Sequence, residues 1–154
     1  MLKLYSLIKF SVSMEVQDSF RLVQSFDYAD IYVVENLPVL IIEATAGYIP
    51  IDEFKKIFVR AEEVVRSKGV QKIIFDKRKL EVFHQPSMEW YFTTWKETLL
   101  ELGVKTHRKL LPDDPTFRKS VEIGRMKIQE KHPNLHTGEM DIRYAQNLEE
   151  AISE

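Results

Sequence analysis

The sequence predicts an α/β fold in which helices pack on a mixed β-sheet. Residues 29–47, ADIYVVENLPVLIIEATAG, hold two runs rich in Val and Ile that are broken at residues 35–38, which is typical of an antiparallel hairpin. After Gly47, stretches with the helical spacing of three and four alternate with short apolar runs. This alternation predicts parallel crossovers, with the helices packed on the sheet.

The elements of the first half can be placed in order along the chain. Residues 20–26 are a candidate edge strand in front of the hairpin. The first helix is expected near residues 51–67, because Pro50 marks its start and Gly69 its end. Residues 70–76, VQKIIFD, lack the alternation of a half-exposed strand, which predicts a strand buried on both faces.

In the second half, a helix is expected over residues 87–102 and strands over residues 104–111 and 140–144.

Capping residues mark two further helices. Asp114-Pro115 is an N-cap followed by proline, which predicts a helix over residues 115–130. Its apolar stripe includes Gly124, which is expected to allow close approach to the sheet. Asn147 with Glu150 three residues later resembles a capping box and predicts a short terminal helix.

The composition excludes several classes of function. The chain has no cysteine, which excludes disulfides, thiolate metal sites and cysteine nucleophiles. Its 22 basic and 24 acidic residues give a net charge of −2, so no nucleic-acid partner is expected. No apolar run approaches the ~20 residues of a membrane helix, and no signal peptide is recognisable, so stable membrane insertion is not expected and a cytoplasmic location is.

One domain is expected. Residues 1–28 are expected to be an N-terminal extension with the edge strand, and residues 29–154 a single α/β domain. Met14 is an alternative start, in which case residues 1–13 precede the native chain.

From about residue 29 to residue 152 the chain resembles the STAS-like family, the anti-sigma-factor-antagonist domains, in its small stand-alone bacterial form. The resemblance is carried by the hairpin leading into AGYIPIDEFKKIF, by GVQKIIFDKRKLEV, by the tryptophan helix PSMEWYFTTWKETLLELGVK, by LLPDD and by the closing DIRYAQNLEEAI. It implies a non-catalytic regulatory module that binds a protein partner.

In that family a partner kinase phosphorylates a serine or threonine that follows an aspartate after the central strand. The matching position here, around His84-Gln85-Pro86, lacks the Asp-Ser pair. Ser87 lies close by but not on the motif. The resemblance therefore does not carry the phosphorylation switch over to this chain.

Asp76 and Arg78 are the first candidate site residues. In an open α/β sheet, ligands bind beyond the carboxyl ends of the parallel strands, where these two side chains are expected to lie. The pair is suited to hold a phosphate, a carboxylate or a partner loop. The alternative is structural: Asp76 accepts loop amide hydrogen bonds and Arg78 folds back to neutralise it.

The tryptophan helix and its first turn supply further candidates. Ser87 is either a plain N-cap or a phosphosite favoured by the helix dipole. Trp95 falls on the apolar stripe and is expected in the core, whereas Trp90 points away from that stripe. Trp90 is therefore either covered by a loop or available as an aromatic anchor for a partner.

The histidines carry no recognisable catalytic or metal chemistry. His132 and His136 have the i, i+4 spacing, but they lie in a loop without a third ligand, so no metal is expected. His84 lies near Asp76 but lacks an accompanying serine elbow, and the five glycines form no nucleotide-binding pattern. No enzymatic activity and no cofactor are expected.

Two functions therefore stay open. The first is a regulatory or protein-interaction module that uses Asp76, Arg78, His84, Ser87 and Trp90, with another protein or a second copy of the chain as the partner. The second is a domain that binds a small apolar ligand or lipid, similar in outline to CRAL-TRIO domains. A large apolar pocket under the tryptophan helix would favour the second.

Overall fold

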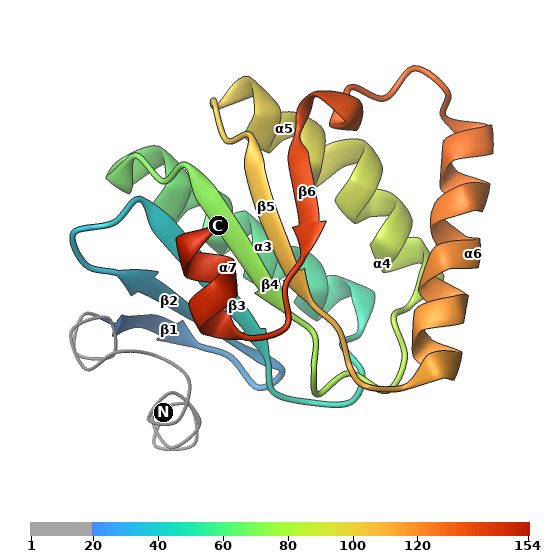
Figure 1. Ribbon diagram of the computed structural model, residues 1–154, viewed down its shortest axis with the longest axis horizontal. Coiled ribbons are helices and arrows are strands. Elements are labelled where there is room, and N and C mark those ends of the chain that lie inside the picture. Colours follow the sequence, from blue (N-terminus) through green and yellow to red (C-terminus); the bar gives the residue numbers. More distant parts are fainter. Residues whose placement is uncertain (1–19) are drawn as a thin grey trace.

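The computed structural model describes residues 20–154, so the expectation about a start at Met14 lies outside the described residues. Six strands form one sheet in the order β1-β2-β3-β4-β5-β6 (Figure 1). The antiparallel part comprises β1 (Phe20–Ser25), β2 (Ala29–Val34) and β3 (Val39–Ala44). The parallel part continues through β4 (Lys72–Asp76), β5 (Thr106–Leu110) and β6 (Asp141–Tyr144). The predicted mixed α/β sheet with a front hairpin is confirmed.

The candidate edge strand over residues 20–26 is also confirmed, since β1 pairs with β2. The sheet therefore begins inside the segment that was expected to be an N-terminal extension.

The helices cover the two faces of the sheet unequally. One face carries α3 (Ile51–Lys68), the tryptophan helix and α6 (Pro115–Lys131), and the other carries α7 (Leu148–Ser153) (Figure 1). A short 3-10 turn, η2 (Thr137–Glu139), precedes β6. None of the helices among residues 20–154 combines the length and the apolar character that crossing a membrane requires.

The core under the tryptophan helix is filled with aromatic rings. The Phe54 and Phe58 rings stack at 4.1 Å between centroids, and the Tyr91 and Trp95 rings stack at 5.4 Å. Trp95 is 1% exposed and donates from Nε1 to the Phe58 carbonyl oxygen at 2.8 Å. The prediction that Trp95 lies in the core is confirmed.

The tryptophan helix changes its pitch in the middle. It runs as α4 (Gln85–Trp90), a π-helical turn η1 (Tyr91–Trp95) and α5 (Lys96–Glu101). The Lys96 amide donates to the Tyr91 carbonyl oxygen, five residues back, which defines the wider turn. On a regular α-helix these two side chains would point about 140° apart. The π-helical turn reduces that angle, and both side chains are buried on the sheet side.

Two details of the predicted helices are wrong. The helix expected to start at Ser87 begins at Gln85, so His84 is the N-cap residue and Ser87 lies inside the first turn. Gly124 was expected to approach the sheet, but it faces α4 instead. A Cβ atom at Gly124 would lie 2.6 Å from Gln85 Oε1 and 3.0 Å from Met88 Sδ, so the glycine lets α6 and α4 pack closely.

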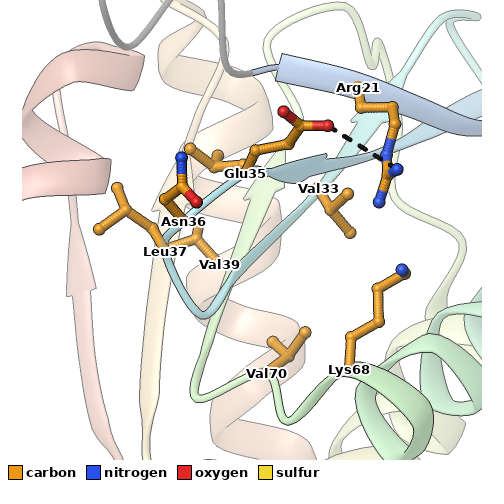
Figure 2. Close-up of a pocket in the computed structure, with 9 residues that line it drawn as sticks. Arg21, Val33, Glu35, Asn36, Leu37, Val39, Lys68 and Val70 are labelled. Carbon is orange, nitrogen blue, oxygen red and sulfur yellow. Dashed lines mark ion pairs between the residues drawn. The ribbon is translucent and has the colours of Figure 1, made fainter.

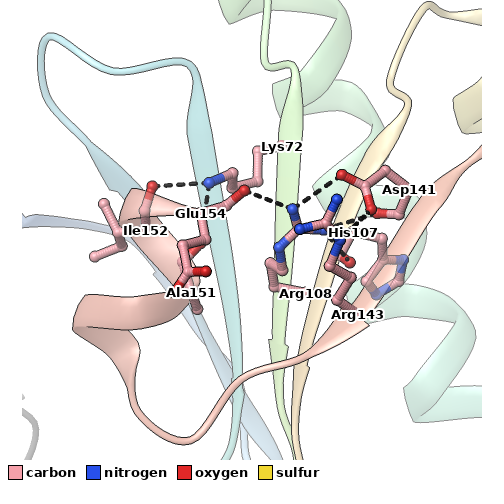
Figure 3. Close-up of polar contacts among 8 residues, drawn as sticks. All are labelled: Lys72, His107, Arg108, Asp141, Arg143, Ala151, Ile152 and Glu154. Carbon is pink, nitrogen blue, oxygen red and sulfur yellow. Dashed lines mark hydrogen bonds and ion pairs between the residues drawn. The ribbon is translucent and has the colours of Figure 1, made fainter.

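Helix α7 is held on the sheet by two cations that reach its carboxyl end. Figure 3 shows Lys72 and Arg108, on neighbouring strands β4 and β5, directed at its last carbonyl groups. Lys72 Nζ donates to the carbonyl oxygens of Ala151 and Ile152 at 3.0 and 2.8 Å. Arg108 Nη2 donates to the Glu154 carbonyl oxygen at 2.5 Å. Positive charge at a helix carboxyl end complements the helix dipole.

Candidate functional site

The carboxyl edge of β4 is organised by a tight ion pair. Asp76 is buried, and its carboxylate accepts from the Arg78 amide at 3.1 Å, from Arg78 Nε at 2.9 Å and from Arg78 Nη2 at 2.8 Å. The expectation that Asp76 ends an interior strand with Arg78 within hydrogen-bond reach is confirmed. Because the guanidinium binds both carboxylate oxygens, the pair fixes the loop after β4. Arg78 also lines an open groove of about 690 Å³ with Arg118, Tyr144 and Glu150.

The other expected site residues lie along α4 and make contacts of their own. His84 Nδ1 lies 3.3 Å from Ser87 Oγ, and the His84 ring packs edge-on against Tyr48. Ser87 is 0% exposed, so its hydroxyl is not accessible to a modifying enzyme in this structure.

Trp90 is half-buried rather than turned away from the core. Its ring packs edge-on against Phe54 of α3 at 6.1 Å between centroids, with Lys55 Nζ 5.9 Å from the ring centroid. Part of the ring therefore stays accessible while α3 covers the rest.

A second cluster of polar side chains lies deeper, between the sheet and the tryptophan helix. Lys77, Lys96 and Lys109 are 1%, 0% and 1% exposed. Lys77 directly follows β4, Lys109 belongs to β5, and Lys96 is the residue that the π-helical turn brings toward the sheet. We call these three residues the buried lysine cluster.

The buried lysine cluster is surrounded by aromatic rings. Lys96 Nζ lies 4.1 Å from the Phe92 ring centroid, and Lys109 Nζ lies 4.8 Å from the same centroid. Lys77 Nζ lies 5.0 Å from the centroid of Phe83. Ring faces attract cations, but they accept no conventional hydrogen bond and carry no net charge.

No carboxylate among residues 20–154 forms an ion pair with any of the three lysines. Lys96 Nζ, in addition, has no hydrogen-bond acceptor in the described part of the chain. Buried lysines are normally paired. This cluster therefore lacks the compensating negative charge that such residues usually have.

Burial and mutual repulsion control protonation in this cluster. Burial is the main cause that lowers the pKa of all three lysines, and for Lys77 and Lys96 the neighbouring lysines lower the pKa further. The pKa of Lys109 falls to about 8, although its interaction with Lys96 raises it, so near physiological pH the amine is mostly protonated and a minor fraction is neutral.

A buried Tyr–His pair adjoins the lysines. The Tyr91 hydroxyl oxygen lies 2.6 Å from His107 Nε2, and His107 Nδ1 has no hydrogen-bond partner among the described residues. Burial raises the pKa of Tyr91 well above its ordinary value, whereas burial and then Lys96 and Lys109 lower the pKa of His107. Both side chains are therefore neutral at physiological pH, and His107 adds no charge to the cluster.

A pocket of about 370 Å³ connects Lys109 to the surface. It lies between the η1 turn, α6 and the β5–β6 edge, and its lining comprises Phe92, Lys109, Glu122, Arg125, Met126, Gln129, Gly138 and Ile142. Among the residues that line the pocket, Lys109 is buried and Arg125 is half-buried. Arg125 Nη1 donates to the Tyr144 hydroxyl at 3.1 Å, which directs its guanidinium toward β6. We call this space the lysine pocket.

A different pocket lies at the opposite end of the sheet. Figure 2 shows it between the β2–β3 turn and the end of α3, with Arg21, Glu35 and Lys68 among its lining residues. Its volume is about 400 Å³. The Arg21–Glu35 ion pair, at 3.7 Å, is solvent-exposed on both sides. Such a pair contributes little to the free energy of folding. None of the described residues that line this pocket is a buried charged residue that an ionic ligand would neutralise.

Sequence reasoning missed the buried lysine cluster. Two signals were present in the sequence. His107 and Lys109 alternate within the strand expected over residues 104–111, so one face of that strand carries two ionisable side chains. The buried positions of the tryptophan helix also recur every four residues, which places Lys96 one position after Trp95 on the buried side.

Comparisons with protein-family models, with curated proteins and with solved structures find no match to this chain. The resemblance to the STAS-like family therefore stays a prediction.

Proposed function

We propose that the protein is a non-catalytic binding module whose ligand is a small organic anion held in the lysine pocket. The observation that carries this proposal is the buried lysine cluster without a carboxylate partner. Burying an uncompensated cation costs several kcal/mol. An anion seated beside Lys109 would offset that cost, because it supplies the negative charge that residues 20–154 do not provide.

The lining of the pocket defines the chemistry of the anion. Lys109 and Arg125 are suited to bind a carboxylate, and Phe92, Met126 and Ile142 offer an apolar wall beside them. The volume of about 370 Å³ is within the range of small-molecule sites. A monocarboxylic acid with a compact apolar or aromatic body matches both features.

A lipid or other wholly apolar ligand is supported less well. The rings of Phe58, Phe75, Tyr91 and Trp95 fill the space under the tryptophan helix where such a ligand would have to lie. The lysine pocket is also unsuited to a wholly apolar ligand, because such a ligand has no group that could pair with Lys109 or Arg125.

The second candidate function is the cytoplasmic regulatory module, with a protein partner or a second copy of the chain, that the STAS-like resemblance implies. One observation favours it. The groove at the carboxyl edge presents Arg78 beside the half-exposed ring of Tyr144, and open α/β sheets commonly bind at this edge. A module that binds an anion at one site and a protein at this edge is compatible with both candidates.

The test of anion binding uses benzoate, with benzyl alcohol as the uncharged analogue and Lys109→Met as the variant. We expect benzoate to raise the melting temperature of the wild-type protein, whereas benzyl alcohol does not. Without any anion, Lys109→Met should be more stable than wild type by about 1–4 kcal/mol, because it removes a buried charge that has no partner. The same variant should lose the response to benzoate.

The matched control is Lys127→Met, which removes an exposed lysine on α6 that does not line the pocket. It should melt and respond like wild type. A Lys109→Met variant that is less stable than wild type and still responds to benzoate would show that Lys109 has a structural role, and the proposed function would fall.

A further inference from the structure

The geometry points to a specific class of ligand for the lysine pocket. We infer that Lys109 is an amine nucleophile. The pocket would hold a carboxylic acid that also carries an aldehyde or ketone group, bound to Lys109 as a reversible imine. This inference rests on the proposed function, since the carboxylate of the ligand is the group that the pocket would bind. The ligand would also form a covalent bond to Lys109 Nζ.

The first support is the position of Lys109 relative to solvent. Among the buried lysines, only Lys109 belongs to the pocket lining, whereas Lys77 and Lys96 do not. A ligand that enters between η1 and α6 therefore reaches the Lys109 amine first. The other two lysines stay behind it as fixed neighbours.

The second support is the environment of the amine. Lys109 Nζ lies over the Phe92 and Tyr91 rings at 4.8 and 5.9 Å from their centroids. It forms no ion pair with a carboxylate of residues 20–154 that would hold it as an ammonium ion. A lysine that is desolvated among apolar groups and lies near another cation, here Arg125, is the kind that forms imines with carbonyl compounds. Its lowered pKa, about 8, agrees with this environment.

The third support is a group that can orient the ligand. Arg125 lies on the same lining, half-buried and fixed by its hydrogen bond to Tyr144. Its guanidinium is suited to bind the carboxylate of a ligand whose carbonyl carbon faces Lys109. Exposed Glu122, also on the lining, would repel the carboxylate from that side and leave the Arg125 side favoured.

The covalent step needs no further reactant. The neutral Lys109 amine attacks the carbonyl carbon and forms a C–N bond, which gives a carbinolamine. The carbonyl oxygen then leaves as water with the two protons of the amine, and a C=N bond remains. Addition of water reverses the step, so the ligand is bound and released without being consumed.

The test uses 4-formylbenzoate, which combines an aldehyde, an aromatic body and a carboxylate, and borohydride, which reduces an imine to a stable amine. The intact mass should show one adduct, and peptide mapping should place it on Lys109. Labelling of Lys109 should be at least about tenfold faster than labelling of exposed Lys127, because a lower pKa leaves more of the amine neutral. Excess benzoate should slow the labelling by competing for the pocket.

Two variants separate this inference from the proposed function. Lys109→Arg keeps the positive charge and cannot form an imine, so it should still respond to benzoate while losing the adduct. Lys109→Met should lose both, and it serves as the second variant if arginine does not fit. In one contrary outcome, the wild-type protein binds benzoate and yet gives no adduct at Lys109, or gives the adduct on Lys77 or Lys96. Either result would contradict the inferred imine at Lys109 and leave the proposed anion binding intact. Protein that neither binds benzoate nor forms the adduct overturns both.

Discussion

At the scale of single residues, the two tryptophans of one helix have different environments. Trp95 is enclosed by Tyr91 and Phe58 and donates its indole N–H to a backbone carbonyl group, so both its apolar and its polar parts are satisfied. Trp90 packs one edge on Phe54 and keeps part of its ring accessible. The first is a core residue, and the second combines partial packing with a surface that a partner can reach.

Truncation of these tryptophans should therefore differ in its effects. Trp95→Ala should lower the free energy of unfolding by about 3–5 kcal/mol, because it leaves a large cavity and removes the indole hydrogen bond to Phe58. Trp90→Ala should lose only about 1–2 kcal/mol, in line with partial burial. Urea unfolding gives both values.

The same two variants test whether Trp90 binds a partner. If it anchors an interface, Trp90→Ala should also weaken association by ~2 kcal/mol or more in a sedimentation or pull-down measurement. Equal losses of stability for the two variants would contradict the half-buried position of Trp90. Unchanged association would remove the best aromatic residue from the protein-interaction candidate.

At the scale of elements, α7 depends on contacts from the sheet. The helix has six residues, and Leu148 and Ala151 are its buried residues. A helix of this length is not stable by itself in water. The cations of Lys72 and Arg108 at its carboxyl end therefore contribute much of what holds it on the sheet.

Removal of these cations should release α7 to different degrees. Arg108→Met should lower the free energy of unfolding by about 2–3 kcal/mol, because Arg108 also donates to the carbonyl oxygen and carboxylate of Asp141. Lys72→Met should lose about 1 kcal/mol, since Lys72 is nearer to solvent. Hydrogen exchange should accelerate at the α7 amides in both variants, and more in Arg108→Met. Unchanged exchange at α7 would show that apolar packing alone holds the helix.

The elements of the fold were predictable because each has a local cause. The change from strand to helical periodicity, the Asp114 and Asn147 caps and the left-handed Gly69 at the end of α3 act within a few residues. Ser87 shows the limit of this reasoning, because a serine after proline looks like a cap, yet the helix already starts at Gln85.

The candidate site was not predictable in the same way. Asp76 and Arg78 are close in sequence, so their pairing could be foreseen. The buried lysine cluster joins the residue after β4, a residue of β5 and a residue of the tryptophan helix, and Lys96 reaches it only through a π-helical turn that propensities do not forecast. Lysine is also among the residues that are least often buried, so the ordinary expectation placed all three in solvent.

At the scale of the whole molecule, the buried lysine cluster should give the protein an unusual dependence of stability on pH. Lys109 has a pKa of about 8 when folded, and an unfolded lysine has a pKa of about 10.4. Between these values the unfolded chain binds a proton that the folded chain does not, so the free energy of unfolding rises with pH. The lowered pKa values of Lys77 and Lys96 act in the same direction. Above about pH 10 the sign reverses, because Tyr91 stays protonated only when folded.

We therefore expect Lys109 alone to add on the order of 2 kcal/mol of stability between pH 8 and pH 10, where many proteins gain none, and Lys77 and Lys96 to increase this gain. His107, whose lowered pKa keeps it neutral when folded, adds a separate loss of stability below about pH 6.5. Urea unfolding at intervals of one pH unit measures both effects. Lys109→Met should remove its own share of the alkaline rise, and Lys127→Met should preserve the whole rise. If the free energy of unfolding of the wild-type protein does not rise with pH in this range, the lysines keep ordinary pKa values when folded. That result would require water to reach the cluster, so that its charges are not buried.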